Sequence, residues 1–321
     1  MMDQRPEIAV IADLPADLRN ALSANFTLVD EPLEGANANA IAIDAISRRY
    51  RAIATRAVLG IPAGLIEALP DLGLVLSMGA GLDHIDSDAL AARGITLAHT
   101  PDQFTEDVAD FALGLIYAAQ RKIVEADRFC RRDAWPQARF QTSHRVSTRR
   151  IGIVGLGRIG QRIAEKCASL GMPVGYYGRT RRAESPHAFH DSIIGLAAAS
   201  DVLVLACAVT EQTRHIVDRD VLAALGPEGI VVNIARGAVV DEAALIDALQ
   251  RKTLGGAALD VFASEPDFDP RLLSLDTVIL TPHSASFTFE ARQAVIDHLL
   301  GAARAFFARD VATPRCPTVD A

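Results

Sequence analysis

Three side chains in the second half of the sequence are suited to proton transfer and to the binding of an acid. Arg236 and His283 each come directly after a short apolar stretch, and Glu265 lies in the loop after a third such stretch. A guanidinium can hold a carboxylate through paired hydrogen bonds, and histidine exchanges a proton near neutral pH. A carboxylate bonded to this histidine would stabilise the imidazolium and fix the orientation of the ring.

Each of these residues has a simpler explanation when it is taken alone. Arg236 could cap the end of a strand or pair with Asp241, and a single histidine is more often structural. In a parallel α/β sheet, however, ligands bind beyond the carboxyl ends of the strands, where all three residues are expected. Their succession at neighbouring strand ends therefore predicts a catalytic group of Arg236, Glu265 and His283.

A glycine-rich motif precedes the three residues and predicts a dinucleotide site. It follows the apolar stretch Ile151–Val154, opens a helical pattern, and consists of Gly155, Leu156, Gly157, Arg158, Ile159 and Gly160. Its glycines would permit a tight turn, close approach of a pyrophosphate, and packing of the helix on the strand. The first helical turn would direct its unpaired N–H groups at the phosphates. The alternative is a glycine turn that binds nothing, which the strand before it and the helix after it disfavour.

The residues after the second predicted strand of this unit indicate which dinucleotide is bound. Enzymes that use NAD carry an acidic residue there for the ribose 2′-hydroxyl. This sequence continues instead with Gly178, Arg179, Thr180 and Arg181. Guanidinium groups can bind a 2′-phosphate through paired hydrogen bonds, although a basic turn can also be simply solvated. The missing carboxylate and the position of the arginines predict a preference for NADP(H), with NAD(H) not excluded.

The composition is that of a soluble globular protein and argues against several other classes. The 321 residues carry a formal net charge of −8, which argues against a nucleic-acid-binding surface over the whole molecule. The four cysteines are scattered, so neither a disulfide framework nor a zinc site is expected, and no metal is predicted. Because the sequence shows no signal peptide and no apolar run of transmembrane length, we expect a cytoplasmic protein with no membrane partner.

Strand-like and helix-like stretches alternate along the chain, which predicts parallel α/β architecture. Several of the strands are apolar at consecutive positions, as expected when helices cover both faces of a sheet. The predicted strands are residues 7–12, 52–55, 74–77 and 95–99 in the N-terminal part, followed by 150–154, 174–177, 202–207, 230–234, 257–261 and 278–280.

Two long helices interrupt this alternation and indicate how the chain divides into domains. Apolar residues recur at three- and four-residue steps over Val108–Ile123 and again over Ala291–Phe306. Because these helices flank the dinucleotide-binding unit, they are expected to link two domains. The prediction is a discontinuous substrate-binding domain of residues 1–98 and 286–321 around a contiguous dinucleotide-binding domain of residues 99–285.

In their order, the motifs resemble the D-isomer specific 2-hydroxyacid dehydrogenase family, from about Ala52 to Arg292. By this resemblance, Arg236 binds the 2-oxo acid. His283 is then the general acid for reduction and the base for oxidation, and Glu265 keeps its ring charged.

The same resemblance implies further ligand contacts. Ser77–Asp86 is similar to the family's substrate loop, whose backbone N–H groups hold the substrate carboxylate, here at Met78, Gly79 and Ala80. The alternative is an ordinary turn between a strand and a helix. Beyond the glycine motif and the basic turn, the implied cofactor contacts are Cys207, Ala208, Thr213, Ile234, Ala235, Arg236, Asp260, His283 and Ala285, with Asp260 near the nicotinamide amide.

The fold that the family implies consists of two Rossmann-like, doubly wound parallel-sheet domains, of which the discontinuous one is flavodoxin-like. The family also implies a homodimer built on the long helix before the glycine motif, and no metal. The basic turn resembles the branch of NADPH-dependent glyoxylate, hydroxypyruvate and hydroxyphenylpyruvate reductases. Ala208 does so as well, because many NAD-using relatives have proline at this position.

The predicted function is the NADPH-dependent reduction of a 2-oxo acid to the D-2-hydroxy acid, with histidine as the proton donor. Glyoxylate, hydroxypyruvate and an arylpyruvate all stay open as substrates, because residue types do not fix the volume of a pocket. Two alternatives are a dinucleotide-sensing binding protein that resembles the family's corepressors and a formate or phosphite dehydrogenase of the same fold. The arginine turn favours a reductive cofactor and therefore the reductase.

Overall fold

The computed structural model describes residues 5–31 and 50–312. The chain forms two compact units, the first of Met1–Phe104 with Thr288–Ala321 and the second of Thr105–Phe287. These divisions lie a few residues after the positions 98/99 and 285/286 that the sequence suggested. At the first division the reason is Phe104, which packs against the hydrophobic core of the first unit.

The first unit is built on a five-stranded parallel sheet in the order β2-β1-β3-β4-β5. Its strands are β1 Glu7–Val10, β2 Thr27–Asp30, β3 Ala52–Arg56, β4 Leu74–Met78 and β5 Thr96–Ala98. Successive residues of a strand point to opposite faces, so Ala52 and Ala54 join one buried cluster and Ile53 joins the other. The sheet therefore has a hydrophobic core on each side.

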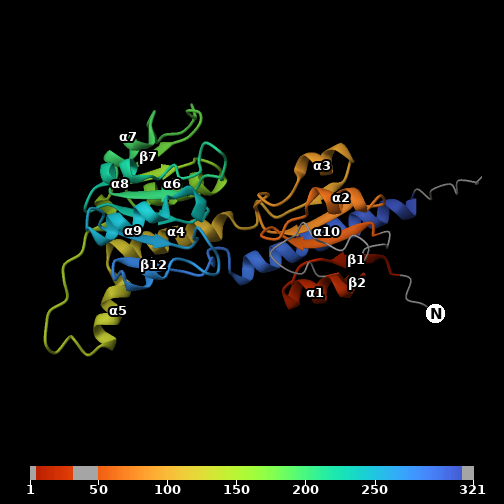
Figure 1. Cartoon of the computed structure of the whole chain (residues 1–321), viewed down its shortest axis with the longest axis horizontal. Coiled ribbons are helices and arrows are strands. Elements are labelled where there is room, and N and C mark those ends of the chain that lie inside the picture. Colours follow the sequence, from red (N-terminus) through yellow and green to blue (C-terminus); the bar gives the residue numbers. More distant parts are fainter. Residues whose placement is uncertain (1–4, 32–49, 313–321) are drawn as a thin grey trace, which may run out of the picture. The chain divides into compact units, whose positions relative to one another are not determined.

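Helices cover both faces of this sheet (Figure 1). Helices α1 (Ala16–Ser23) and α10 (Phe289–Ala312) contribute to the cluster on one face. Helices α2 (Ala63–Ala68) and α3 (Ser87–Ala92) contribute to the cluster on the other. Because α10 packs on the N-terminal sheet, the unit is discontinuous in sequence.

The second unit contains a seven-stranded parallel sheet in the order β12-β11-β10-β9-β6-β7-β8. The strands are β6 Ile151–Val154, β7 Val174–Tyr177, β8 Ala188–Phe189, β9 Val202–Leu205, β10 Ile230–Asn233, β11 Gly256–Leu259 and β12 Val278–Leu280. The order reverses at β6, since β7 follows on one side and β9 lies on the other. Such a switch point leaves room for a ligand beyond the carboxyl ends of the two central strands.

Two helical layers enclose this sheet as well. On one face, α7 (Ile193–Ala198), α8 (Arg219–Leu225) and α9 (Glu242–Gln250) bury their apolar residues in one cluster with the strands. Helices α4 (Thr105–Gln120) and α6 (Arg158–Ser169) pack side by side and also contact the strands. The predicted α/β fold with two doubly wound parallel sheets is confirmed.

The predicted helix over Val108–Ile123 is wrong at its C-terminal end. Helix α4 ends at Gln120, Lys122 adopts a left-handed conformation with φ of +51°, and α5 (Ile123–Arg131) begins after it. The left-handed residue changes the direction of the chain, so Ile123 does not continue the buried stripe and is 53% exposed. Helix α5 buries none of its residues and projects from the unit (Figure 1).

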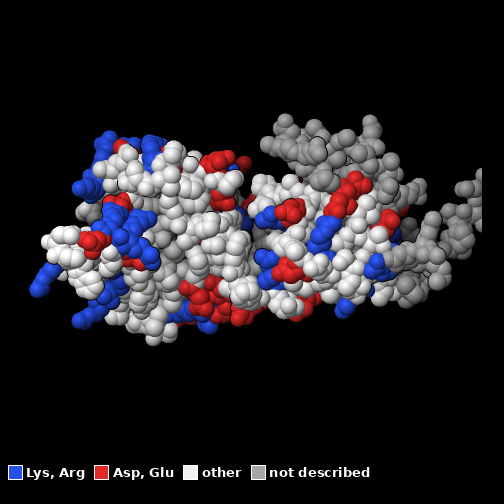
Figure 2. Space-filling view, turned by 90° about the horizontal axis from the view of Figure 1, so that it is seen from below, with Lys and Arg blue, Asp and Glu red and all other residues white. Residues whose placement is uncertain are grey.

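The surface carries both signs of charge. On the face drawn in Figure 2, acidic and basic side chains are both present on each unit. Within residues 5–31 and 50–312, no helix combines the length and the apolar character that crossing a membrane requires.

Candidate active site

The glycine motif forms the turn between β6 and α6, beside the point where the strand order reverses. Gly155 has a φ of +94°, and a Cβ there would lie 2.8 Å from the Cα of Cys207 on the neighbouring strand's loop. A Cβ on Gly160 would collide with the carbonyl oxygen of Gly155. Both positions therefore exclude a larger residue, because the turn, the helix and the adjacent loop touch through their backbones.

The outer side of the same turn fits a dinucleotide. A Cβ on Gly157 would meet no atom within 4 Å, so a ligand can approach the backbone closely there. Gly157 is also the N-cap of the twelve-residue helix α6 and has no side chain to bond the free N–H groups of the first turn. These groups, on and around Arg158 and Ile159, suit a pyrophosphate.

The basic turn directly follows β7, which pairs with β6. The backbone N–H of Gly155 donates to the carbonyl of Tyr177 at 2.8 Å, so the basic turn and the glycine turn start side by side. Arg179, Thr180 and Arg181 are exposed, and a Cβ on Gly178 would meet no atom within 4 Å. Within the described part of the chain, neither arginine forms an ion pair with a carboxylate. Both guanidinium groups are therefore available to an anionic ligand.

The loop after β9 borders the glycine turn on its other side. The hydroxyl of Thr213 donates to the carbonyl of Ala208 at 2.7 Å and accepts from the N–H of Thr210 at the same distance, which closes the loop. Burial raises the pKa of the Cys207 thiol to about 11. The thiol is therefore protonated at neutral pH, so Cys207 is suited to packing against a ligand and not to nucleophilic chemistry.

Arg236 follows β10 through the buried residues Ile234 and Ala235. One nitrogen of its guanidinium, Nη1, donates to the carbonyl of Ala235 at 2.8 Å. A short 3-10 helix, Gly237–Val239, begins directly after Arg236. The side chain is therefore held at the carboxyl end of the sheet.

Glu265 and His283 form a hydrogen-bonded pair. The Nδ1 atom of His283 lies 2.7 Å from Oε2 of Glu265, and Oε1 of Glu265 accepts from the N–H of Phe262 at 2.9 Å. Partial burial raises the pKa of the Glu265 carboxyl, but the bonds from His283 and Phe262 and the positive charge of Arg236 outweigh it. The net pKa is lowered, so the carboxylate is ionised beside the imidazole at neutral pH.

The positive charge of Arg236 helps to lower the pKa of the Glu265 carboxyl, and His283 contacts Glu265 directly. The structure thus brings together the three residues that the sequence singled out for chemistry. They come from the loops after β10, β11 and β12, which are neighbours in the sheet.

Asp260 organises the loop that carries His283. Its carboxylate is 1% exposed and accepts from the hydroxyl of Thr281 at 2.7 Å and from the N–H groups of Ser284 and Ala285 at 2.9 and 3.0 Å. Its backbone carbonyl accepts from the N–H of His283, whose φ is +51°. Asp260 therefore lies within the site, with its side chain directed to this loop.

The residues of the predicted substrate loop belong to the first unit. Met78 ends β4, and Gly79 has a φ of +133°, where a Cβ would lie 2.5 Å from the Cβ of Ala57. The N–H of Gly79 donates to the hydroxyl of Thr100 at 2.9 Å. The glycine is thus required by the backbone, and Ala80 follows at the partly exposed end of the turn.

Sequence reasoning missed two polar residues that support the site. The side chain of Asn233, at the end of β10, bonds to the backbone around Arg236. The carboxylate of Glu242, at the start of α9, accepts from the N–H of Ala263 in the loop that carries Glu265. A polar residue that closes an apolar strand was the available signal for Asn233.

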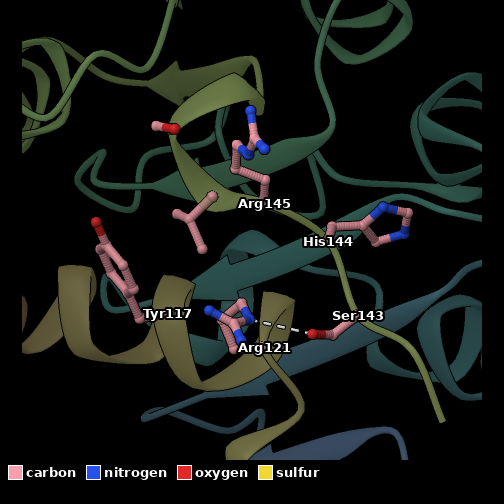
Figure 3. Close-up of a pocket in the computed structure, with 7 residues that line it drawn as sticks. Tyr117, Arg121, Ser143, His144 and Arg145 are labelled. Atoms are coloured by element: carbon pink, nitrogen blue, oxygen red, sulfur yellow. Dashed lines mark hydrogen bonds between the residues drawn. The ribbon is translucent and has the colours of Figure 1, made fainter.

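A separate pocket of about 400 Å³ lies between α4 and the segment 143–147 (Figure 3). Arg121 donates to the hydroxyl of Ser143 across it at 3.1 Å. The side chains of His144 and Arg145 extend in different directions (Figure 3), and none of the predicted site residues lines it. Its basic groups do not converge on one point, so it has no evident role in the chemistry described above.

Comparison with known proteins finds relatives over most of the chain. A family model described as "D-isomer specific 2-hydroxyacid dehydrogenase, NAD binding domain" matches residues 113–285. The chain is 41% identical over 308 residues to a glyoxylate/hydroxypyruvate reductase A of Arabidopsis thaliana, which covers 96% of this chain and 98% of that protein. It is 39% identical over 300 residues to a hydroxyphenylpyruvate reductase of Plectranthus scutellarioides, covering 94% of this chain and 95% of that protein.

A solved structure is similar over nearly the same length. It is an NADPH-dependent glyoxylate/hydroxypyruvate reductase from Sinorhizobium meliloti in complex with NADP and malonate, with a TM-score of 0.85 and 37% identity. The similarity covers 95% of this chain and 94% of that one. Because the family model spans more than half of the sequence and these proteins match it almost from end to end, the chain belongs to the D-isomer specific 2-hydroxyacid dehydrogenase family.

Proposed function

We propose that this protein reduces a 2-oxo acid to the D-2-hydroxy acid with NADPH. The observation that carries the proposal is the 2.7 Å pair of His283 and Glu265, close to Arg236 and on the same sheet edge as the glycine turn. Relatives named as reductases of glyoxylate, hydroxypyruvate and hydroxyphenylpyruvate support this reaction class. The substrate is a small 2-oxo acid of this kind.

Arg236, His283 and Glu265 each have a separate role in this reaction. Arg236 holds the carboxylate of the 2-oxo acid and polarises the adjacent carbonyl. His283 donates a proton to the carbonyl oxygen as negative charge develops there, and in the reverse direction it removes that proton. Glu265 stabilises the charged form of His283 and keeps its ring oriented, because its other carboxylate oxygen is held by the N–H of Phe262.

The dinucleotide is bound by the second unit. The residues that would hold its pyrophosphate are Gly155, Leu156, Gly157, Arg158, Ile159 and Gly160. The bound nicotinamide supplies the hydride. In this proposal the remaining cofactor contacts are Cys207, Ala208, Thr213, Ile234, Ala235, Asp260 and Ala285. Met78, Gly79 and Ala80 are proposed for the substrate carboxylate, with Gly79 contributing its backbone conformation, because its N–H donates to the hydroxyl of Thr100.

The preference for NADPH rests on the basic turn. Arg179 and Arg181 are exposed next to the glycine turn, and the turn of residues 178–182 after β7 contains no acidic residue that would repel a 2′-phosphate. Gly178 leaves the backbone open, and Thr180 adds a hydroxyl donor. The similar structure from Sinorhizobium meliloti, described as NADPH-dependent, supports this assignment. NADH is a weaker cofactor in this proposal.

The partner for assembly is a second copy of this chain. Helix α5 buries none of its residues, Ile123 is 53% exposed, and Trp135 in the segment after it is 71% exposed. The proposed interface between the two copies includes these two exposed apolar side chains. Sedimentation velocity is expected to give a dimer, and Trp135→Glu is expected to shift it toward monomer. Leu170→Glu, directly after α6, is expected to leave the oligomeric state unchanged. A wild-type monomer would contradict the assignment.

A panel of 2-oxo acids tests the function. The wild-type protein is assayed for NADPH consumption with glyoxylate, hydroxypyruvate, phenylpyruvate and hydroxyphenylpyruvate, and again with NADH. We expect turnover with at least one acid and a higher kcat/KM for NADPH. Tight binding of NADPH without turnover of any acid would indicate a dinucleotide sensor instead. Oxidation of formate or phosphite with NADP⁺ in place of 2-oxo acid reduction would indicate the other dehydrogenase reaction.

A further inference from the structure

Asn233 is one of the few buried polar residues of the second unit, and both hydrogen bonds of its side chain go to the backbone of the turn that follows β10. It is the last residue of β10 and is 1% exposed. Its Nδ2 donates to the carbonyl of Arg236 at 3.1 Å, and its Oδ1 accepts from the N–H of Ala235 at 3.0 Å. Both ends of one amide are therefore bonded to the backbone on either side of the peptide that leads into Arg236.

The backbone after Arg236 is fixed from the opposite direction. A Cβ on Gly237 would collide with the carbonyl of Phe262 and approach the nitrogen of Ala263. The turn after Arg236 therefore packs without a gap on the loop that carries Glu265. Arg236 therefore lies between the side chain of Asn233 and the loop of Phe262. The contact of Gly237 with this loop prevents the Arg236 backbone from moving toward Glu265.

Asn233 is also joined to the strand that leads to the other half of the site. Its backbone carbonyl accepts from the N–H of Asp260 at 3.0 Å. The side chain of Asp260 in turn holds the loop of His283. The two buried polar residues at the ends of β10 and β11 are thus directly linked, and each controls one loop.

We propose that Asn233 is a positioning residue that sets the placement of Arg236 relative to Glu265 and His283. It acts through the Arg236 backbone and does not itself touch the substrate. The proposal deepens the proposed function, because it takes from it the assignment of Arg236 to the substrate carboxylate. An amide suits this position, because its Nδ2 donates to the carbonyl of Arg236 while its Oδ1 accepts from the N–H of Ala235.

A double-mutant cycle between Asn233 and Arg236 provides the test. In the wild-type background, Asn233→Ala is expected to lower kcat/KM for the 2-oxo acid about tenfold, because the guanidinium is no longer held at the position that suits the carboxylate. In an Arg236→Lys background, the same change is expected to cost less than about twofold, since the group that Asn233 positions is gone. An equal loss in both backgrounds would overturn the proposal.

Ser200→Ala is the matched control for the loss of a buried hydrogen bond. Ser200 is 5% exposed, donates to the carbonyl of Leu196 at 2.7 Å, and lies before β9, at the opposite end of the same sheet. It is expected to lower Tm without changing kcat/KM. If Asn233→Ala does not fold, Asn233→Ser supplies the cycle, because a hydroxyl can still accept from the N–H of Ala235. If Asn233→Ser lowers kcat/KM by the same factor in the wild-type and the Arg236→Lys backgrounds, the proposal is contradicted.

Amide hydrogen exchange separates this proposal from the assigned reaction. The N–H of Ala235 is expected to exchange faster in Asn233→Ala than in the wild type, and to be unchanged in Ser200→Ala. The exchange rate of the Ala235 N–H is measured without substrate. It therefore tests the role of Asn233 even if the wild-type protein reduces no 2-oxo acid and the proposed function is wrong. Unchanged exchange at Ala235 in Asn233→Ala would overturn the positioning role.

Discussion

The Nδ1 atom of His283 lies 2.7 Å from Oε2 of Glu265, across 18 residues of sequence. The other carboxylate oxygen is bound by the N–H of Phe262, so the carboxylate is fixed at both ends. This arrangement assigns Nδ1 of His283 to Glu265, so in the proposed reaction the opposite ring nitrogen, Nε2, is the one that exchanges a proton with the substrate.

Glu265→Gln is expected to shift the pH dependence of reduction. Glutamine keeps the size of the side chain but removes the negative charge that stabilises the imidazolium. The alkaline limb of kcat/KM should therefore move to lower pH, and kcat/KM at neutral pH should fall about tenfold or more. The profile is measured from pH 5 to 9, with Glu228→Gln, an exposed position at the other end of the sheet, as control. Superimposable profiles would exclude an electrostatic role for Glu265.

Arg179→Ala and Arg181→Ala are expected to weaken the use of NADPH and leave the use of NADH almost unchanged. Each change removes a guanidinium from the turn after β7, where only NADPH offers a 2′-phosphate. The ratio of kcat/KM for NADPH to that for NADH should fall about tenfold for at least one variant, which corresponds to about 1.4 kcal/mol.

Arg251→Ala, at the end of α9, removes an exposed arginine from the same unit without touching this turn. It should leave the ratio as it is. A parallel decrease with both cofactors in the two turn variants would argue against recognition of the phosphate by these arginines.

Asp201→Asn is expected to destabilise the second unit in a pH-dependent manner. Burial raises the pKa of Asp201, but the bonds from the side chain and the N–H of Arg150 and the charge of Arg149 outweigh it, so the net pKa is lowered. A lowered folded-state pKa means that stability is gained above the unfolded value of about 3.9 and is lost as pH falls through the folded value.

The variant should therefore be less stable than the wild type by about 2 kcal/mol at pH 7, and the difference should narrow below about pH 4. Urea unfolding at several pH values measures this. Asp191→Asn, at an exposed position of the same unit, is expected to have little effect at any pH. A difference for Asp201→Asn that stays constant down to pH 3 would rule out the ion pair as its source.

The sequence predicted those strands that are buried along their whole length and consist of consecutive apolar residues. The apolar stretches at β6, β9 and β10 lie where their runs of hydrophobic residues indicated. The strands β2 and β8 were missed, because they are short edge strands with few buried residues and little apolar pattern. The helix break at Lys122 was missed because periodicity of side chains does not record a left-handed backbone.

The proximity of Arg236, Glu265 and His283 could be predicted because parallel strands bring their carboxyl ends to one edge. The hydrogen bonds of Asn233 and Asp260 could not, since they depend on how each loop turns after its strand. Buried polar residues at strand ends need partners, and only the folded backbone shows which groups these are.

The most direct test of the proposed reaction is the rate of NADPH consumption by His283→Ala with the best 2-oxo acid of the panel. The kcat of the variant should be about 10²-fold to 10⁴-fold lower than that of the wild type, as expected when a general acid is lost. Its Kd for NADPH should be unchanged. His298→Ala, on the exposed side of α10, is the control and should retain full activity. Near-normal turnover in His283→Ala would contradict the account.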